Sequence, residues 1–257
     1  MNGDKREKIM ECLKEMKLRA FRQVYDEVLT KCLKARKGPE DFLLDLLKQE
    51  VASRRASALK NRIKNAKFPQ VKDLDTFDFG ESAVDEAMIR HLYEGGLFEE
   101  TKNIVFMGGS GTGKTHLATS IGLSLTRKGH KVKFWNLIDL VNELEKEKEQ
   151  GRAGDIMRKM NRFSVMILDE LGYLPFSKLG AQLLFHLMSS WYENIPVIIT
   201  TNLEFKEWDS IFHNHKMTVA LLDRLTHHCE IIETGMESYR LKSRQHNGGY
   251  KNAETSD

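Results

Sequence analysis

The stretch Gly108–Thr115, which reads GGSGTGKT, has the residue types and spacing of a phosphate-binding loop. It follows an apolar run at 104–107 and precedes a helix-forming run, which is the strand, loop and helix order that such a loop needs. Glycines allow backbone conformations that place successive N–H groups around phosphate oxygens, and the start of the helix adds its positive dipole end. The glycines suited to this role are Gly108, Gly111 and Gly113.

The Gly-Lys-Thr end of the loop predicts how a nucleoside triphosphate would be held. Lys114 would reach the β- and γ-phosphates, and the hydroxyl of Thr115 would bind Mg²⁺ on the other side of them. We therefore predict ATP and Mg²⁺ as ligands. The residues predicted to contact the nucleotide here are Gly108, Gly109, Ser110, Gly111, Thr112, Gly113, Lys114, Thr115 and His116.

An acidic pair follows another apolar run, VMIL at 165–168. Asp169 and Glu170 would lie at the carboxyl end of a buried strand, where α/β sheets bind ligands. Asp169 would hold Mg²⁺ through water, and Glu170 would polarise the water that attacks the γ-phosphate. An acidic pair that caps the next loop is the alternative, and the phosphate-binding loop upstream favours the hydrolytic role.

Two further residues could complete a hydrolytic site. Asn202 follows the apolar run at 196–200, and its amide would orient the attacking water if that strand lies between those of the phosphate loop and Asp169. An ordinary strand-end Asn is an equally good interpretation. Arg224, on a short amphipathic segment, could stabilise transition-state charge in a neighbouring subunit's site, or could form a surface pair with Asp223.

The clustered histidines do not predict a metal site. His227 and His228 are adjacent, so they would point in different directions if they enter a strand, whereas zinc needs ligands that converge on one centre. The motif HNH at 213–215 lacks the surrounding acids of a nuclease. Polar loop histidines are the favoured interpretation.

The composition favours a soluble protein with one medium α/β domain and a smaller appendage. The chain has 257 residues, of which 40% are hydrophobic and 30% are charged. No apolar run reaches the length of a membrane span, and the N-terminal sequence lacks the apolar core of a signal peptide. The three scattered cysteines argue against a disulfide framework. We interpret the chain as a reduced, cytoplasmic protein.

Positive charge is concentrated at 1–68, which holds 18 Lys and Arg against 10 Asp and Glu, whereas the remainder holds 22 against 27. Apolar spacing predicts one helix over 5–33 and a second from Pro39 to about Phe68. The second half of that second helix is basic, and such a stripe can neutralise DNA phosphates; a solvated helix face is the alternative. The predicted DNA contacts are Arg54, Arg55, Lys60, Arg62 and Lys64.

The remaining chain predicts an α/β P-loop NTPase domain at 83–257, joined to the small all-helical domain by a linker at 69–82. Strands and helices alternate, which predicts a parallel sheet with helices on both faces and right-handed crossovers. Five strands are expected. They lie near 103–107, 131–135, 165–168, 196–200 and 229–233.

The motifs GGSGTGKTHLA, ILDELGYLPF, ITTN and LLDRLTHHCEII together resemble the IstB family of AAA+ ATPases, which assist insertion-sequence transposases. DnaC-type helicase loaders are near relatives of that family. The resemblance implies a sheet ordered 5-1-4-3-2, with Asn202 as a sensor and Arg224 as an arginine finger acting in trans. It also implies ATP-dependent homo-oligomers on duplex DNA and a transposase as partner.

One departure from general AAA+ design is visible at the end of the chain. Only 24 residues follow Glu233, which are too few for the helical lid that usually carries a second sensing arginine. We therefore expect no C-terminal helical lid. Arg240 is the candidate to replace that arginine at the nucleotide.

These features lead us to expect an ATPase that assembles on duplex DNA and assists a transposase. The alternative is a DnaC-like helicase loader, in which the N-terminal helices would grip a helicase and single-stranded DNA would be the ligand. A small-molecule phosphotransferase is disfavoured, because no basic cluster for a second substrate stands near the loop.

Overall fold

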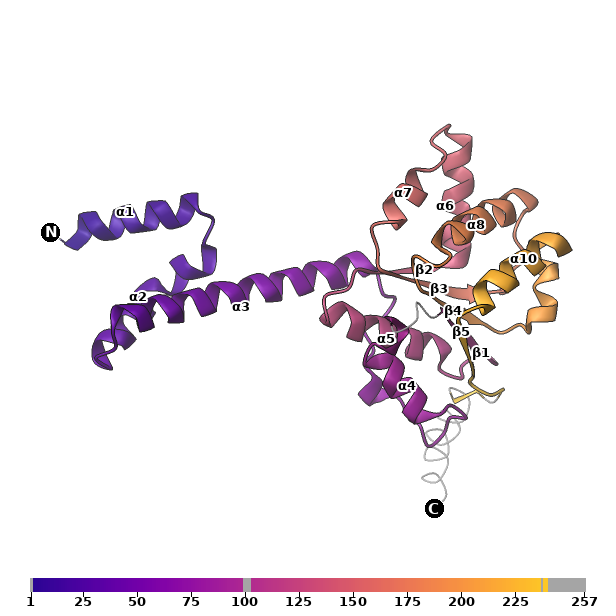
Figure 1. The fold of residues 1–257 in the computed structure, drawn as a ribbon, viewed down its shortest axis with the longest axis horizontal. Coiled ribbons are helices and arrows are strands. Elements are labelled where there is room, and N and C mark those ends of the chain that lie inside the picture. Colours follow the sequence, from indigo (N-terminus) through magenta and orange to yellow (C-terminus); the bar gives the residue numbers. More distant parts are fainter. Residues whose placement is uncertain (1, 99–102, 237, 240–257) are drawn as a thin grey trace, which may run out of the picture. The chain divides into compact units, whose positions relative to one another are not determined.

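The computed structural model describes residues 2–98, 103–236 and 238–239 (Figure 1). The chain forms two compact units, Met1–Asn61 and Arg62–Asp257. The boundary falls inside helix α3, Pro39–Ala66, so that the end of this helix belongs to the second unit. Within the described residues, no helix is both long enough and apolar enough to cross a membrane.

The first unit begins with two helices where the sequence predicted one over 5–33. The chain turns at Lys17, which has a φ of +56°. Glu50 on α3 then takes the place of a local cap, because its Oε2 accepts the backbone N–H groups of Ala20 (2.9 Å) and Phe21 (3.0 Å). The group that stabilises the break lies on another helix, so apolar periodicity could not reveal it. The two helices are α1, Asn2–Glu15, and α2, Arg19–Lys34.

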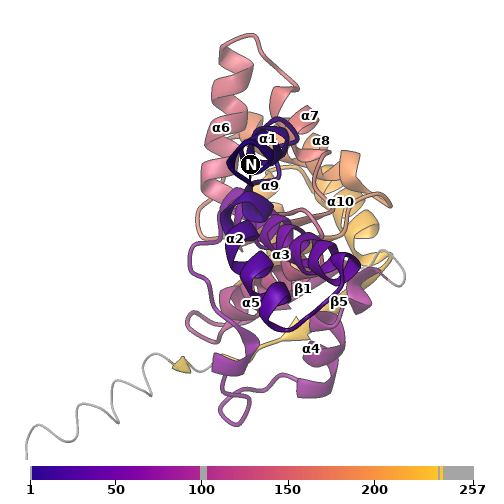
Figure 2. The same ribbon diagram turned by 90° about the vertical axis from the view of Figure 1, so that its left-hand side faces the viewer.

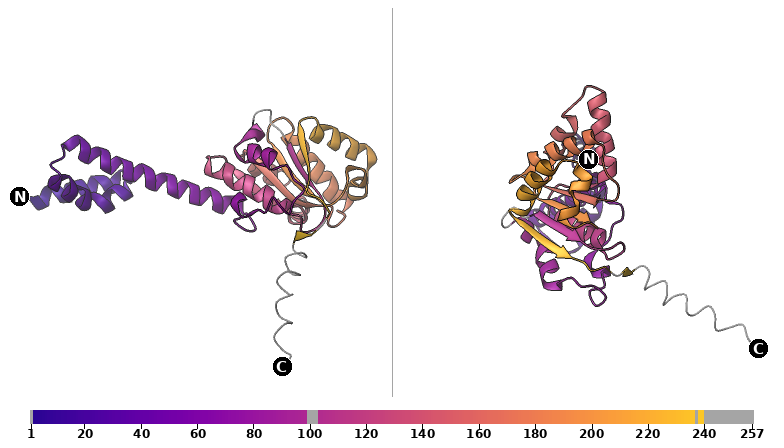
Figure 3. Two further views of the ribbon diagram at one scale, coloured as in Figure 1. Left: turned by 90° about the horizontal axis from the view of Figure 1, so that it is seen from below. Right: turned by 90° about the vertical axis from the view of Figure 1, so that its right-hand side faces the viewer.

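The second unit is built on a five-stranded parallel sheet, as predicted. The strand order is β2-β3-β4-β1-β5, which confirms the expected order, and β5 forms one edge of the sheet (Figure 3). Strand β4 therefore lies between β1 and β3, the condition on which the role of Asn202 depends. The strands are β1, Asn103–Met107; β2, Val132–Asn136; β3, Val165–Leu171; β4, Val197–Thr201; and β5, Cys229–Glu233.

Successive buried residues of each central strand pack on opposite faces of the sheet. Ile104 and Phe106 pack with α5, whereas Val105 between them packs with the helices of the other face. Figures 1 and 2 show α6 and α7 on the opposite side of the sheet from α4. The first face carries α4, Glu86–Tyr93, and α5, Lys114–Arg127; the second carries α6, Leu137–Glu149, α7, Asp155–Met160, α8, Lys178–Trp191, α9, Asp209–Phe212, and α10, His215–Thr226.

Replacing Glu50 with Ala tests the contact between α3 and α2. Loss of a cap of this kind costs about 1–2 kcal/mol, and we expect Glu50→Ala to lower the free energy of unfolding by that amount in chemical denaturation. Burial alone would raise the pKa of the Glu50 carboxyl, but hydrogen bonds from Arg54, Phe21 and Ala20 lower it below its ordinary value of 4.5. The stabilisation is therefore present above pH 4.5 and is lost as the pH falls through the lowered pKa.

Glu40→Gln, at an exposed position in the first turn of the same helix, is the matched control. Equal losses of stability in the two variants, or a loss for Glu50→Ala that persists unchanged at low pH, would contradict the capping role.

Candidate functional site

The phosphate-binding loop leaves the carboxyl end of β1 and enters α5. The N–H of Gly108 donates to the carbonyl of Thr201 at the end of β4 (3.2 Å), so the loop begins between two strands. Gly111 and Gly113 have φ values of +80° and +98°, which residues with side chains rarely adopt. Gly113 directly precedes α5, and the first N–H groups of that helix are therefore available to phosphate oxygens.

Lys114 and Thr115 lie where the loop becomes helix. The Nζ of Lys114 donates to the carbonyl oxygens of Gly108 (2.7 Å) and Gly109 (2.5 Å), which holds the ammonium group against the loop's own backbone. The hydroxyl of Thr115 donates to Asp169 Oδ1 (2.8 Å). The two side chains predicted to hold Mg²⁺ are thus adjacent, and a hydroxyl with a carboxylate is an oxygen donor set that fits this ion.

Asp169 lies near the end of β3 and is only 5% exposed. In addition to the hydroxyl of Thr115, its Oδ1 accepts the hydroxyl of Thr200 at 2.5 Å. Burial raises the pKa of this carboxyl above its ordinary value of 3.8, and the hydrogen bonds from Thr200 and Thr115 offset only part of the rise. A cation beside the carboxylate would favour its charged form.

Glu170 is exposed, unlike its neighbour Asp169. The register between β3 and β4 shifts at 168–171, and Glu170 has a φ of +65° while its N–H donates to Thr200 Oγ1 (2.9 Å). Such an irregularity redirects a side chain. The carboxylate of Glu170 accepts a hydrogen bond from Asn136 Nδ2 at Oε2 (2.6 Å).

Both acidic residues line a cavity of about 730 Å³. The phosphate-binding loop from Gly111 to His116 forms part of its wall, together with the carboxyl ends of β2 and β3. The linker contributes Lys72, Thr76 and Phe77. The volume is within the range of small-molecule sites, about 300–1,000 Å³. One cavity is therefore lined by the phosphate-binding loop, the acidic pair and the linker.

Comparison with known proteins agrees with this geometry. A family model described as IstB-like ATP binding protein matches residues 11–247. The chain belongs to this family. A Geobacillus stearothermophilus relative, named as an ATP-binding protein of insertion sequence IS5376, is 38% identical over 80% of this chain and 82% of its own. The corresponding IS21 protein of Pseudomonas aeruginosa is 34% identical over 92% of this chain and 89% of its own.

Solved structures show that the IstB-like chain has the AAA+ fold. DnaA from Aquifex aeolicus with bound AMPPCP matches with a TM-score of 0.55 at 17% identity, over 74% of this chain and 58% of that one. DnaI matches with a TM-score of 0.53 at 18% identity, over 63% of this chain and 90% of that one. At these identities the likeness concerns the fold alone.

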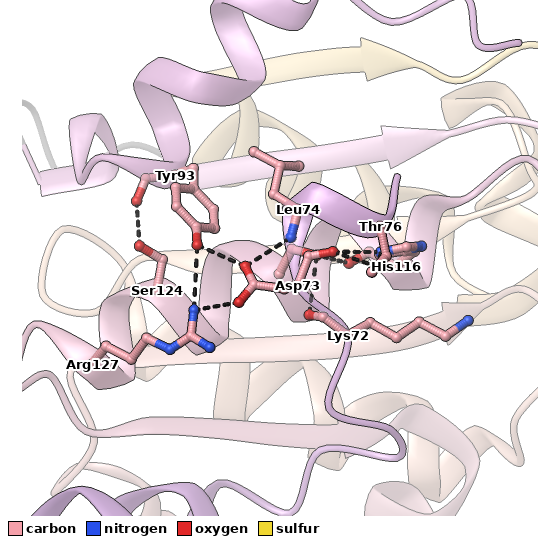
Figure 4. A network of polar contacts seen from close by, with 9 residues as sticks. Lys72, Asp73, Leu74, Thr76, Tyr93, His116, Ser124 and Arg127 are labelled. Atoms are coloured by element: carbon pink, nitrogen blue, oxygen red, sulfur yellow. Dashed lines mark hydrogen bonds and ion pairs between the residues drawn. The ribbon is translucent and has the colours of Figure 1, made fainter. Parts of the chain in front are cut away.

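In this IstB-like protein, Asp73 attaches the linker to α4 and α5 (Figure 4). Its carboxylate accepts the hydroxyl of Tyr93 (2.7 Å) and pairs with Arg127 (2.5 Å), while its carbonyl is hydrogen-bonded to His116 Nε2 (3.0 Å). Burial alone would raise the pKa of the Asp73 carboxyl, but the hydrogen bonds from Tyr93 and Arg127 lower it. The carboxylate of Asp73 is therefore charged in the contacts that hold the linker against α4 and α5.

The linker places Phe77 beside the phosphate-binding loop. Its ring meets that of His116 edge to face, with centroids 5.3 Å apart, and a Cβ on Gly113 would lie 2.5 Å from its Cε2. Burial lowers the pKa of His116, which favours the neutral ring in this contact. Phe77 therefore both packs on the domain and lines the cavity.

Arg224 lies away from the cavity of its own chain. It occupies the last turn of α10, where it donates to Ser189 Oγ (2.7 Å) and lies 5.7 Å from the ring centroid of Phe185. It lines a small hollow with Asn103 and Val197, the first residues of β1 and β4. Because the phosphate-binding loop follows the opposite end of β1, Arg224 does not join that loop within one chain.

Asn202 directly follows β4, at the same edge of the sheet as the loop and the acidic pair, and it is exposed. It is not among the residues that line the 730 Å³ cavity. Arg240 lies outside the described residues, and Tyr239 immediately before it lines the cavity.

The five basic residues predicted to contact DNA differ in their surroundings. Arg55, Lys60 and Lys64 are exposed on α3. Arg54 is exposed but pairs with Glu50 (2.8 Å). Arg62 is half-buried, and its Nε donates to the carbonyl of Thr126 near the end of α5 (3.2 Å). Within the part of the chain that the structure describes, the first three are set apart because they are exposed and have neither an ion pair nor a backbone acceptor.

Sequence reasoning missed two polar residues of the site, Thr200 and Asn136. Thr200 bonds both acidic residues, and Asn136 holds the carboxylate of Glu170. Each stands in the last two positions of its strand. The signal that could have found them is the one that found Asp169, a polar side chain at the carboxyl end of a buried apolar run.

Replacing Gly113 with Ala tests the fit between the loop and the linker. A positive φ costs a residue with a side chain about 1–2 kcal/mol, and the new Cβ would also collide with Phe77. Gly129→Ala is the control, because Gly129 has a φ of +105° and open space around its Cβ position. We expect the larger loss of unfolding free energy for Gly113→Ala, and we expect Phe77→Ala in the same chain to recover the difference. Equal losses in the two single variants would contradict the contact.

Proposed function

We propose that this protein hydrolyses ATP with Mg²⁺ as a homo-oligomer on duplex DNA, where it assists the transposase of its insertion sequence. The hydrolytic part of the proposal rests on one observation, which is that the adjacent residues Asp169 and Glu170 lie in different environments. Asp169 is buried and bonded to the hydroxyl of Thr115, whereas Glu170 is exposed to the same cavity. One acid is thereby suited to a metal ion, and the other to a water molecule.

Each side chain then has a defined task. Lys114 would transfer its hydrogen bonds from the loop carbonyls to the β- and γ-phosphates, and Thr115 with Asp169 would hold the metal. When bound, Mg²⁺ supplies positive charge to the phosphate oxygens. Glu170 polarises the attacking water, and the bond from Asn136 fixes where that carboxylate points. Asn202, directly after the strand that lies between those of the loop and the acids, orients the same water.

The position of Arg224 supports an assembly of several copies. Arginine fingers stabilise charge on the transferred phosphoryl group and contribute about 10³–10⁵ in rate. Arg224 lies at the sheet end remote from its own loop, so it can perform this task only for another subunit. The hydrolytic site is then complete only in an oligomer.

The DNA part of the proposal rests on charge and on family. The segment 1–68 has eight more basic than acidic residues, and four of the five candidate contacts, all but Arg62, are exposed. Basic groups on one helix can displace counterions from duplex DNA. The relatives of this chain are named after the insertion sequences that carry them, and a transposase is the natural partner for a DNA-bound ATPase of that origin.

Glu170→Gln tests the hydrolytic role. The amide cannot accept a proton from water, and we expect phosphate release to fall by about 10²–10⁴ while ATP binding is kept. Fluorescent-nucleotide titration and steady-state phosphate release measure the two properties. Glu149→Gln, an exposed glutamate at the end of α6, is the control and should behave as wild type. Normal hydrolysis by the Glu170 variant would refute the assigned role.

A triple variant, Arg55→Ala with Lys60→Ala and Lys64→Ala, tests the DNA arm. Each phosphate contact contributes about 0.9 to the slope of log K against log salt, so we expect the slope for duplex DNA to fall by about 2–3. Anisotropy titrations across a salt series measure it.

The control for this variant removes three exposed lysines of the second unit, Lys131, Lys206 and Lys216. An unchanged slope in the arm variant would contradict duplex binding by α3. That result, joined to lost binding of a helicase, would favour the helicase-loader alternative.

A further inference from the structure

The chain segment that follows β5 runs across the phosphate-binding loop. The N–H of Thr234 donates to the carbonyl of Met107 (2.8 Å), and the N–H of Gly109 donates to the carbonyl of Gly235 (2.9 Å). The two segments are joined on both sides of the point where β1 becomes the loop. Residues more than a hundred positions apart in the sequence therefore form one backbone unit.

Two loop glycines are required by this contact. A Cβ on Gly108 would lie 2.5 Å from Thr234 Oγ1, and a Cβ on Gly109 would lie 2.6 Å from the carbonyl oxygen of Met236. Both separations are shorter than real Cβ contacts, so the segment after β5 can pass this close to the loop only because both positions are glycine. From sequence, Gly108 was assigned to the phosphate cradle; its close neighbour in the structure is Thr234.

A pair of buried hydroxyls links the segment to the inside of the loop. Thr112 Oγ1 and Thr234 Oγ1 are 2.6 Å apart, and the residues are 6% and 4% exposed. Thr112 donates its only hydroxyl hydrogen to the carbonyl of Gly109 (2.9 Å). With that hydrogen on the Gly109 carbonyl, Thr234 is the donor within the pair; the carbonyl of Met107, at the longer distance of 3.3 Å, is the alternative acceptor of the Thr234 hydrogen.

The chain of hydroxyls ends at an oxygen that also contacts Lys114. The carbonyl of Gly109 accepts both the hydroxyl of Thr112 and the ammonium of Lys114, the latter at 2.5 Å. The orientation of this carbonyl thus depends on Thr234 on one side and determines the position of Lys114 on the other.

We propose that Thr234 is a positioning residue of the nucleotide site, whose hydroxyl acts through Thr112 to orient the Gly109 carbonyl and, through it, Lys114. The ligand follows from the proposed function, since the phosphates of ATP and ADP are what Lys114 would bind. On this proposal, the segment after β5 contributes to nucleotide binding because it shapes the phosphate-binding loop. Tyr239, five residues further along the same segment, lines the cavity.

Thr234→Val tests the proposal, because valine keeps the shape and removes only the hydrogen bond. We expect the Kd for ATP and for ADP to rise about three- to tenfold, the effect of one buried hydrogen bond. The KM for ATP should rise by the same factor, with kcat changed less than twofold, because the loop holds the phosphates alike in the ground and transition states. Thr234→Ser, which keeps the hydroxyl, should bind nucleotide as wild type does.

Thr218→Val is the matched control. Thr218 is 2% exposed on α10, and its hydroxyl donates to the carbonyl of Asn214 (3.0 Å), away from the loop. We expect both valine variants to lose thermal stability and only Thr234→Val to lose affinity for nucleotide. Thr112→Val breaks the same pair from the other side, so it carries the test if Thr234→Val does not fold. Combined with Thr234→Val, it should add less than its own separate effect.

Three results would overturn the proposal. They are wild-type affinity in Thr234→Val, full additivity of the effects of Thr112→Val and Thr234→Val on affinity, or a loss of affinity in Thr234→Ser equal to that in Thr234→Val. Wild-type protein that binds neither ATP nor ADP would refute the proposed function as well. If only the inference about Thr234 fails, the wild-type protein still binds ATP and ADP, so the two failures can be told apart.

Discussion

The hydroxyl of Thr200 donates to Asp169 Oδ1 at 2.5 Å and accepts the N–H of Glu170 at 2.9 Å. This one group joins β4 to both acids of β3, and it can do so only because β4 lies between β1 and β3. The same strand order brings the acids beside the phosphate-binding loop, where Thr115 bonds Asp169. The register shift that accompanies the contact leaves the neighbouring carboxylates in opposite environments, one buried and one exposed.

Much of this site could be predicted from local sequence. The loop, the acidic pair and the parallel sheet all follow from apolar runs and the polar residues that end them, because each signal lies within a few positions. The groups that were missed act across the fold. Thr200 and Asn136 look like ordinary strand-end residues until the strand order makes them neighbours of the acids. The break between α1 and α2 at Lys17 was missed for the same reason, since the stabilising Glu50 stands on another helix.

Charge in the sequence was a weaker guide than geometry. Arg62 and Lys64 are similar members of one basic run, yet Arg62 is directed to a backbone carbonyl of α5 and Lys64 is exposed. The same distinction applies to Arg224, whose value to catalysis depends on which end of the sheet it occupies. A residue at the start of the strands cannot serve a loop at their ends, so an arginine there could take part in catalysis only if a second subunit presents its own loop.

The central claim is a hydrolytic site completed by a neighbour, and mixing two inactive variants tests it most directly. Arg224→Ala keeps Glu170 but offers no arginine to its neighbour, whereas Glu170→Gln keeps the arginine but cannot use water. We expect ATP hydrolysis on duplex DNA to be near background for each variant alone and to recover substantially in an equimolar mixture, because mixed neighbours assemble intact sites. A mixture as inactive as its components, although the two variants co-assemble, would contradict the account.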